Sequence, residues 1–496
     1  MPVRSARTAV FWRQVKDHMD EAPLVVAAET PIGEVVASLR KDERTAAVVA
    51  DGDRGDEHAG VRLLGILTEE DVVRRVTFQA DPETPVADFM TSPMESIGAE
   101  DYLYTAIAHM RMLGLRHMPA VDEYGRAVGM LRLPEAYAAA AVGMLEHLDG
   151  LTSDGSIAGM RAVRHAQVAL AEELFEDNLP APEIQRVITH LNNDMGRRIT
   201  EMNIAAMERE GKGGPPVPFA MIIMGSGGRG ENFFHPDQDN GFVLEDYPES
   251  EHEEIDAWFA DLAERVTRDL DGVGIPYCKG NVMATNPLWR KPLWQWKEQT
   301  THWTDDRTPQ SIRNADIFFD FRWLYGERHL VASLREHVSE ISSGNQRFLY
   351  QLMRDPDADK VALAWFNQLA TDRRNSEHAG KVDLKRNGTM PLVQGVRLLA
   401  LREGVTRTAT LDRLAALRER GALRDGRADD LRDAFVEITS LLMKTQLATI
   451  RAGHAPGNHV SPEDLSRRDH ERLVRALKTV QTFRNALRYT LTSGKV

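Results

Sequence analysis

The sequence predicts an α/β protein that continues into an all-α region. Three observations carry this prediction: a repeated strand–helix–strand pattern near the start, two apolar strands around a glycine-rich turn at 219–244, and helical spacing with few strand-like runs after 330. We therefore expect four regions in chain order. They are a pair of repeats at 1–145, a helical connector at 146–212, a core with a mixed sheet at 213–330, and a helical bundle at 331–496.

Composition bounds the class of protein. The hydrophobic content of 42% and charged content of 27% over 496 residues are typical of globular proteins with large cores. The net charge of −14 argues against a nucleic acid partner, which normally requires a basic face. A single cysteine, Cys278, excludes an internal disulfide framework and fits a reducing cytosol. With neither a secretory signal nor an 18-residue apolar run, we expect a cytoplasmic protein without a membrane partner.

The first region contains an internal repeat, with copies at about 12–80 and 83–145. Val15–Met19 recurs as Val86–Met90, an offset of 71 residues. Gly65-Ile66-Leu67 matches Gly129-Met130-Leu131, where extra residues in the first copy shorten the offset to 64. Two copies are too few for a solenoid, but they are enough to bury a shared face.

A short motif ends each copy. The first copy carries Gly65, Thr68 and Asp71 within GILTEEDVV, whereas the second has Arg132 and Glu135 at the hydroxyl and acid positions. This pattern resembles a tandem pair of CBS domains, a module that often senses adenine nucleotides. The resemblance implies AMP, ADP or ATP at the first copy, with the Thr68 hydroxyl on phosphate and Asp71 on ribose. It also implies a homodimer, because such pairs commonly dock face to face.

Two plainer alternatives stay open for this motif. A threonine followed three residues later by an acid also resembles a capping box at a helix start. The repeat pair could equally serve dimerisation alone.

In the connector that follows, Pro180 and Pro182 separate two helical patterns. The connector either transmits the state of the repeats or acts only as a scaffold.

The most informative stretch is 219–246. An apolar run, Phe219–Met224, predicts a buried strand and breaks at Gly225-Ser226-Gly227-Gly228; Asp237 and Asp239 then precede a second apolar run, Gly241–Leu244. Residues two apart on a strand share a face, so the two carboxylates should lie about 6–7 Å apart along it. Paired carboxylates suit Mg²⁺ together with substrate phosphates, and a glycine turn lets backbone N–H groups approach an anion. The plainer alternative is a glycine-rich hairpin with solvated acids.

The string GSGGRGE followed by Asp-Gln-Asp-Asn resembles the polymerase β-type nucleotidyltransferases. It is similar above all to nucleotidyltransferases of bacterial signal transduction that carry CBS domains, relatives of the uridylyltransferases of nitrogen-regulatory proteins. The resemblance implies Mg²⁺- or Mn²⁺-dependent transfer of a nucleoside monophosphate from a nucleoside triphosphate to a hydroxyl acceptor, a protein or a small molecule. It further implies that the Ser226 hydroxyl and the backbone of Gly225–Gly228 hold phosphates, and that Arg229 neutralises charge or pairs with Glu231.

The same resemblance implies a third carboxylate on a neighbouring strand. Asp320, between Phe319 and Phe321, fits that position, and Asp316 is the second candidate. An acid in an apolar strand is costly unless it is paired or binds a metal. We therefore expect Asp237, Asp239 and Asp320 to hold the metal and carry catalysis.

In the helical bundle, Lys385 is expected to reach the triphosphate across a cleft, the alternative being a solvated helix start. A second function stays open: a non-catalytic, nucleotide-sensing regulator that acts through partner binding. The retained acids count against this alternative.

Overall fold

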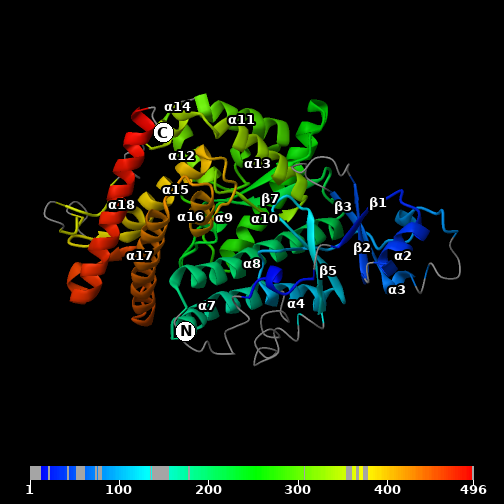
Figure 1. The fold of residues 1–496 in the computed structure, drawn as a ribbon, viewed down its shortest axis with the longest axis horizontal. Helices are drawn as coiled ribbons and strands as arrows, with labels where there is room; N and C mark the ends of the chain where they lie inside the picture. The colour runs from blue at the N-terminus through cyan, green and yellow to red at the C-terminus, as the bar shows by residue number, and fades with distance from the viewer. Residues whose placement is uncertain are drawn as a thin grey trace. The chain divides into compact units, whose positions relative to one another are not determined.

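The computed structural model describes residues 13–20, 23–41, 44–51, 62–72, 75, 81–133, 136, 156–176, 179–305, 308–353, 360–364, 368–372 and 378–493. The chain divides into two compact units, which are residues 1–163 with 325–333 and residues 164–324 with 334–496. Figure 1 shows the chain coloured from its N-terminus to its C-terminus. None of the described helices combines the length and apolar character that a membrane span requires.

The first unit contains the predicted pair of repeats. In both copies the first strand runs parallel to the second and the second antiparallel to the third, so the two three-stranded sheets have the same topology (Figure 1). The first copy comprises β1 (Leu24–Ala27), α2 (Ile32–Lys41), β2 (Ala46–Asp51), β3 (Arg62–Thr68) and the short α3 (Glu69–Asp71). The second comprises β4 (Ile97–Gly98), α4 (Leu103–Met112), β5 (His117–Val121) and β6 (Ala127–Arg132).

The two copies exchange equivalent contacts. A Cβ atom added at Gly65, on β3, would lie 2.5 Å from the sulfur of Met90, which belongs to the start of the second copy. A Cβ atom added at Gly129, on β6, would lie 2.2 Å from the sulfur of Met19, at the start of the first copy. The leading segment of each copy thus packs on the third strand of the other. The repeat is therefore a paired unit, and glycine leaves the space that each methionine fills.

The second unit is built on a mixed four-stranded sheet with the order β10-β7-β8-β9. The strands are β7 (Phe219–Ile223), β8 (Asn240–Leu244), β9 (Arg290–Pro292) and β10 (Arg322–Gly326). β8 runs antiparallel to β7 and parallel to β9. This arrangement confirms the predicted mixed sheet.

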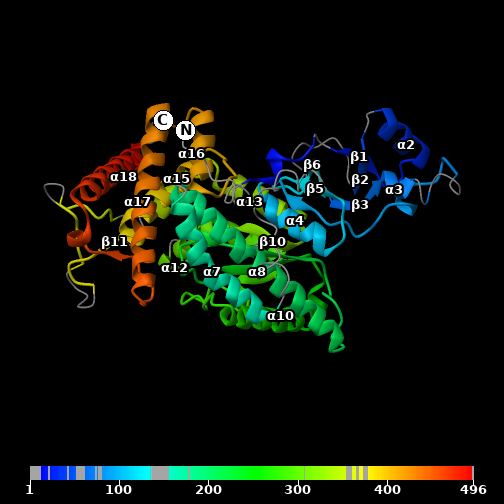
Figure 2. The ribbon, with the colours of Figure 1, turned by 90° about the horizontal axis from the view of Figure 1, so that it is seen from below.

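Two long helices cover one face of this sheet. They are α8 (Ala181–Arg209), which follows α7 (Ile157–Glu176), and α10 (His252–Gly272), and Figure 2 shows α8 beside α10. Thr200 on α8 contacts the sulfur of Met221 at 3.3 Å, and Phe259 on α10 packs on Phe219 with ring centroids 5.1 Å apart. Met221 and Phe219 are two residues apart on β7, so both helices cover the same face. The predicted division into four domains, with a separate connector, stays a prediction.

The rest of the second unit is mainly helical, as predicted. Helices α15, α16, α17 and α18 pack on one another, and Figures 1 and 2 both show them gathered together. The helices are α11 (Leu293–Asp305), α12 (Pro309–Phe318), α13 (Arg328–Ser342, of which 328–333 belong to the first unit), α14 (Gln346–Met353), α15 (Met390–Arg402), α16 (Thr410–Glu419), α17 (Asp425–Arg451) and α18 (Arg467–Ser493). A π-helical turn, Lys385–Thr389, leads into α15, and the short strands β11 (Val382–Asp383) and β12 (His459–Val460) pair nearby.

Candidate functional site

The glycine-rich turn follows β7 directly and forms a five-residue helix, α9 (Gly225–Arg229). Gly225 has a φ of +54°, which L side chains rarely adopt, and a Cβ atom there would lie 2.4 Å from Asp239 Oδ2. A Cβ atom at Gly228 would lie 1.9 Å from the backbone oxygen of Asp320. Both positions require glycine, because a Cβ atom there would overlap with Asp239 or with the backbone of Asp320.

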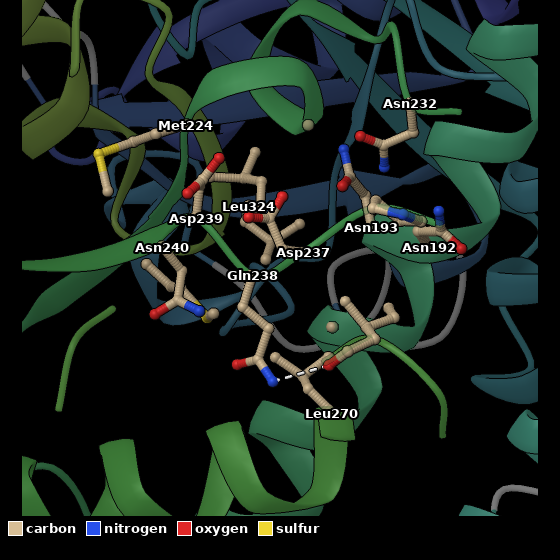
Figure 3. A pocket seen from close by; sticks show the side chains of 16 residues that line it. Asn192, Asn193, Met224, Asn232, Asp237, Gln238, Asp239, Asn240, Leu270 and Leu324 are labelled. Atoms are coloured by element: carbon tan, nitrogen blue, oxygen red, sulfur yellow. Dashed lines mark hydrogen bonds between the residues drawn. The ribbon is translucent and has the colours of Figure 1, made fainter. Parts of the chain in front are cut away.

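The two predicted acids lie together immediately ahead of β8. Asp237 is exposed and Asp239 is half-buried. Their carboxylate oxygens and the Cys278 sulfur all lie within 4.8 Å of one another, the one such group of possible metal ligands among the residues that the structure describes. Figure 3 shows the two carboxylates on one side of the segment that leads into β8, while Gln238 between them points away.

Cys278 reaches this position on a loop that runs along the acids. The backbone N–H of Gln238 donates to the Pro276 oxygen at 3.0 Å, and the N–H of Asn240 donates to the Val282 oxygen at 3.1 Å. Asp239 lies between the two bonded residues of its own segment, and Cys278 lies between the two bonded residues of the loop. Reasoning from the sequence did not identify Cys278 as part of the site, because nothing in its spacing indicates that the loop folds against the acids.

The electrostatics of this group favour a bound cation. Burial raises the pKa of Asp239 to about 7, and the charge of Asp237 acts in the same direction. Burial, followed by the charge of Asp239, raises the pKa of the Cys278 thiol to about 12. Like charges held this close disfavour ionisation unless a positive group compensates them. Two carboxylates and a sulfur within reach of one another therefore fit a divalent cation.

Lys385 lies near enough for its charge to lower the pKa of Asp239, against the larger effect of burial. Its side chain is half-buried at the start of the π-helical turn. The structure thus brings Lys385 towards the acids. Its contact with phosphate stays a prediction.

A pocket adjoins the acids, between α8 and the sheet (Figure 3). Within the described part of the chain, three buried amide atoms on this pocket have no hydrogen-bond partner: Asn192 Nδ2, Gln238 Oε1 and Asn240 Nδ2. The orientation of the Gln238 amide is fixed, because its Nε2 atom donates to the oxygens of Thr267 at 2.9 Å and Ile275 at 2.8 Å. Buried polar groups normally find partners, so this pocket is suited to a polar guest.

Asp320 does not join the two acids. Its side chain is fully buried, and its Oδ1 atom accepts from Arg413 Nη1 at 2.7 Å. Its Oδ2 atom accepts from Arg229 Nη1 at 2.7 Å and also from Arg397. Burial alone would raise the pKa of Asp320, but Arg397, Arg413 and Arg229 together hold it well below its usual range. Asp316, the second candidate, pairs with Arg397 as well.

The expectation that Asp320 is a catalytic metal ligand is therefore corrected. Both of its oxygens are occupied by guanidinium groups, and it lies outside the group formed by Asp237, Asp239 and Cys278. The reasoning that an acid among phenylalanines needs compensation holds. The compensation comes from arginines instead of a metal.

Of the two roles expected for Arg229, the structure shows the pairing with Glu231. Its Nε atom donates to Glu231 Oε2 at 2.7 Å, so the structure shows the pairing alternative and not a group that is free to bind phosphate. Glu231 Oε1 in turn accepts from the backbone N–H of Thr410 at 2.7 Å, and the Thr408 hydroxyl donates to the Gly228 oxygen at 2.9 Å. The glycine turn is thus anchored to the start of α16.

The Ser226 hydroxyl donates to Asn232 Oδ1 at 2.8 Å. The roles of Ser226 and of the backbone of Gly225, Gly227 and Gly228 in holding phosphates stay predictions.

The motif in the first repeat forms a helix cap. The backbone N–H of Asp71 donates to the Thr68 hydroxyl at 3.3 Å, and the N–H of Thr68 donates to Asp71 Oδ2 at 3.0 Å. This is the capping-box alternative, and Gly65 serves the packing on Met90. In the second copy, Arg132 pairs with Asp20 at 2.9 Å, and Glu135 lies outside the described residues. Nucleotide binding by Gly65, Thr68 and Asp71 stays a prediction.

Several known proteins are similar to part of this chain. An uncharacterised 17.7 kDa protein of Acidianus ambivalens is 25% identical over 109 residues, which are 22% of this chain and 62% of the relative, so the chain spans less than two thirds of that curated relative. A CBS domain protein of Pyrobaculum aerophilum, solved in complex with AMP, is 23% identical, with a TM-score of 0.22; the match covers 25% of this chain and 88% of that one. A CBS-domain containing protein of Agrobacterium tumefaciens is 28% identical, with a TM-score of 0.22, over 25% of this chain and 98% of its own.

Three family models match successive parts of the sequence. The CBS domain model matches residues 15–77 and 86–136. The model described as "Putative nucleotidyltransferase DUF294" matches residues 165–310. The model described as "Putative nucleotidyltransferase substrate binding domain" matches residues 346–491. Together these matches cover most of the chain, in the order that its repeats and its Gly-Ser…Asp-x-Asp stretch predict, and the protein belongs to the DUF294 nucleotidyltransferase family with tandem CBS domains.

Proposed function

We propose that this protein transfers a nucleoside monophosphate from a nucleoside triphosphate to a hydroxyl group of an acceptor, with Mg²⁺ or Mn²⁺ as cofactor. One observation carries the proposal. Asp237 and Asp239 lie side by side ahead of β8, beside a glycine turn and a small pocket, and their oxygens lie within reach of one shared cation. Such paired carboxylates bind Mg²⁺ together with the phosphates of a substrate.

The residues of the site have different proposed roles. Asp237 and Asp239 would hold the metal ion, which supplies charge neutralisation to the triphosphate when it is bound. Lys385 adds a positive charge near Asp239, and the backbone of the Gly225–Gly228 turn offers N–H groups for the phosphates. The reaction joins the acceptor oxygen to the α-phosphorus and breaks the bond between that phosphorus and the leaving oxygen of pyrophosphate. The O–H bond of the acceptor also breaks, and its proton passes to solvent.

The set of site residues differs from the one that the family resemblance implied, because Asp320 is excluded. Arg229, Glu231 and Asp320 instead fix the glycine turn against α15 and α16. Proximity and orientation contribute much of the rate of such group transfers, so a rigid turn is part of the proposed mechanism.

The repeat pair would regulate this activity. Its match to the CBS model and the Gly65, Thr68 and Asp71 motif support binding of AMP, ADP or ATP at the first copy. The pair would also form a homodimer. The acceptor is a protein hydroxyl or a small alcohol, and we place the reaction in the cytoplasm.

A second candidate function is a non-catalytic regulator that binds nucleotide at the repeat pair and acts through a partner. The enclosure of Asp320 by three arginines favours this candidate, since it removes one of the carboxylates expected of an enzyme. Metal dependence separates the two functions, because binding at the repeat pair does not involve Asp237.

The test is a transfer assay with each α-labelled nucleoside triphosphate and Mg²⁺, using fractionated extract or an added alcohol as acceptor. Wild type should transfer label and release pyrophosphate, and Asp237→Asn/Asp239→Asn should do neither. The matched control is Asp433→Asn, an acid with a 73% exposed side chain on α17, which should behave as wild type. Equal transfer by the double variant and wild type would contradict the proposal.

A further inference from the structure

Cys278 is placed against the two acids by a rigid loop. Its own backbone oxygen accepts from the N–H of Asn281 at 3.0 Å, and Asn281 has a φ of +55°, so residues 278–281 form a tight turn. The ends of this loop are tied to the residues on either side of Asp239, as described above. The Ala284 N–H adds a bond to Asn240 Oδ1 at 2.9 Å. The position of the sulfur is therefore built into the fold.

The three ligand atoms differ in chemistry. The Asp237 and Asp239 oxygens are hard ligands that suit Mg²⁺ or Mn²⁺, whereas the Cys278 sulfur is a soft ligand that selects ions such as Zn²⁺, Co²⁺ or Cd²⁺. All three lie within 4.8 Å of one another, close enough to share one ion after small side-chain adjustments. An ion that uses the sulfur must use the same carboxylates that Mg²⁺ would use.

Two buried amides line the adjoining pocket. Asn192 is 4% exposed and Asn240 is 1% exposed, and in the part of the chain that the structure describes their Nδ2 atoms have no partner. Their N–H groups are donors, so they suit an oxygen-bearing group beside the cation and are not ligands of the cation itself.

We propose that Asp237, Asp239 and Cys278 form a mixed oxygen–sulfur site that binds a thiophilic divalent cation in competition with Mg²⁺. On binding, a metal–sulfur bond forms, the S–H bond breaks, and its proton passes to solvent without any electron transfer. The coordination does not depend on the proposed function. Its consequence, that Zn²⁺ blocks nucleotide transfer by occupying the Mg²⁺ position, does rest on that function.

Cobalt titration of the full-length protein tests the site directly. Cys278 is the single cysteine of the chain, so any sulfur-to-cobalt charge-transfer absorption must come from it. Wild type should develop this band, and an excess of Mg²⁺ should remove it. Cys278→Ser should lack the band, and Asp237→Asn should bind Co²⁺ more weakly by on the order of tenfold or more. Absence of the band in wild type, or a band with unchanged affinity in Asp237→Asn, overturns the proposal.

A second measurement needs no variant at Cys278. Zn²⁺ should protect the Cys278 thiol of wild type from alkylation after mild heating or low urea, and should not protect it in Asp237→Asn/Asp239→Asn. Equal alkylation with and without Zn²⁺ overturns the proposal. Failure of this proposal is distinguishable from failure of the proposed function, because Mg²⁺-dependent binding of nucleoside triphosphate by wild type in the absence of Zn²⁺ reports on the latter alone.

Discussion

Arg229 Nη1 donates to Asp320 Oδ2 at 2.7 Å, and this buried ion pair joins the glycine-rich turn to the helical part of the second unit. Asp320 also binds Arg413 at 2.7 Å and Arg397, from α16 and α15. We call Arg229, Arg397, Arg413, Glu231, Asp316 and Asp320 the arginine cluster; its charges balance, with three of each sign. The cluster fixes the turn, while the acids ahead of β8 remain accessible to a cation.

The first prediction concerns the arginine cluster. Asp320→Asn should lower the free energy of unfolding by about 3–5 kcal/mol, because it leaves three buried guanidinium groups without their shared anion. Urea denaturation measures the change. Asp237→Asn is the control, and it should leave the stability close to that of wild type because Asp237 is exposed. A stable Asp320→Asn protein would contradict the structural role of the cluster.

The second prediction is a dependence on pH. The three arginines hold the pKa of Asp320 below its ordinary value of 3.8, although burial acts in the opposite direction. A lowered pKa in the folded state means that the ionised carboxylate contributes its full stability above the unfolded pKa. The contribution then declines as the pH falls towards the folded pKa.

The difference in unfolding free energy between wild type and Asp320→Asn should therefore be constant from about pH 7 to pH 5 and shrink below about pH 4. Urea titrations at several pH values, with both proteins in the same concentration of sucrose to keep the variant folded, measure this difference. A difference that grows on acidification would show that the carboxylate is not stabilised in its ionised form.

The third prediction concerns the glycine turn. Gly225→Ala should abolish metal-dependent nucleotide binding, because the added Cβ atom would lie 2.4 Å from Asp239 Oδ2. The matched control is Gly421→Ala, where φ is +72° and no heavy atom lies within 4 Å of the added Cβ. Both variants should lose about 1–2 kcal/mol to the left-handed backbone, but the control should keep its nucleotide binding. Intact nucleotide binding in Gly225→Ala would show that metal-dependent binding does not require Asp239 in its present position.

The fourth prediction concerns the repeat pair. AMP should bind without a divalent metal, and Asp71→Asn should weaken this binding by about tenfold or more, whereas Asp237→Asn should leave it unchanged. Calorimetric titration of AMP in the presence of EDTA measures both effects. AMP affinity that is equal in Asp71→Asn and wild type would exclude the first copy as the nucleotide site.

Local patterns in the sequence predicted the elements that local chemistry determines. The offset between Met19 and Met90, and between Gly65 and Gly129, predicted the repeat, and the structure shows these residues packed across the two copies. The alternation of Asp237 and Asp239 predicted their shared side. These features depend on spacing along the chain, which a single sequence displays directly.

Features that depend on distant partners were not predictable in the same way. The charge of an acid between Phe319 and Phe321 must be compensated. The sequence does not show whether a metal ion or an arginine compensates it. Asp320 pairs with Arg397 and Arg413, which lie 77 and 93 residues after it along the chain. The position of Cys278 could not be predicted for the same reason. Its loop is held against the acids by hydrogen bonds to residues distant in the sequence, and no spacing pattern indicates these bonds.

The most direct test of the central claim is calorimetric titration of each nucleoside triphosphate into the full-length protein, with and without Mg²⁺, for wild type, Asp237→Asn and Asp433→Asn. We predict that one or more nucleotides bind with a dependence on Mg²⁺ that is lost in Asp237→Asn and kept in Asp433→Asn. Nucleotide binding that is indifferent both to the metal and to Asp237 would contradict the claim, and it would place the ligand at the repeat pair of a non-catalytic regulator.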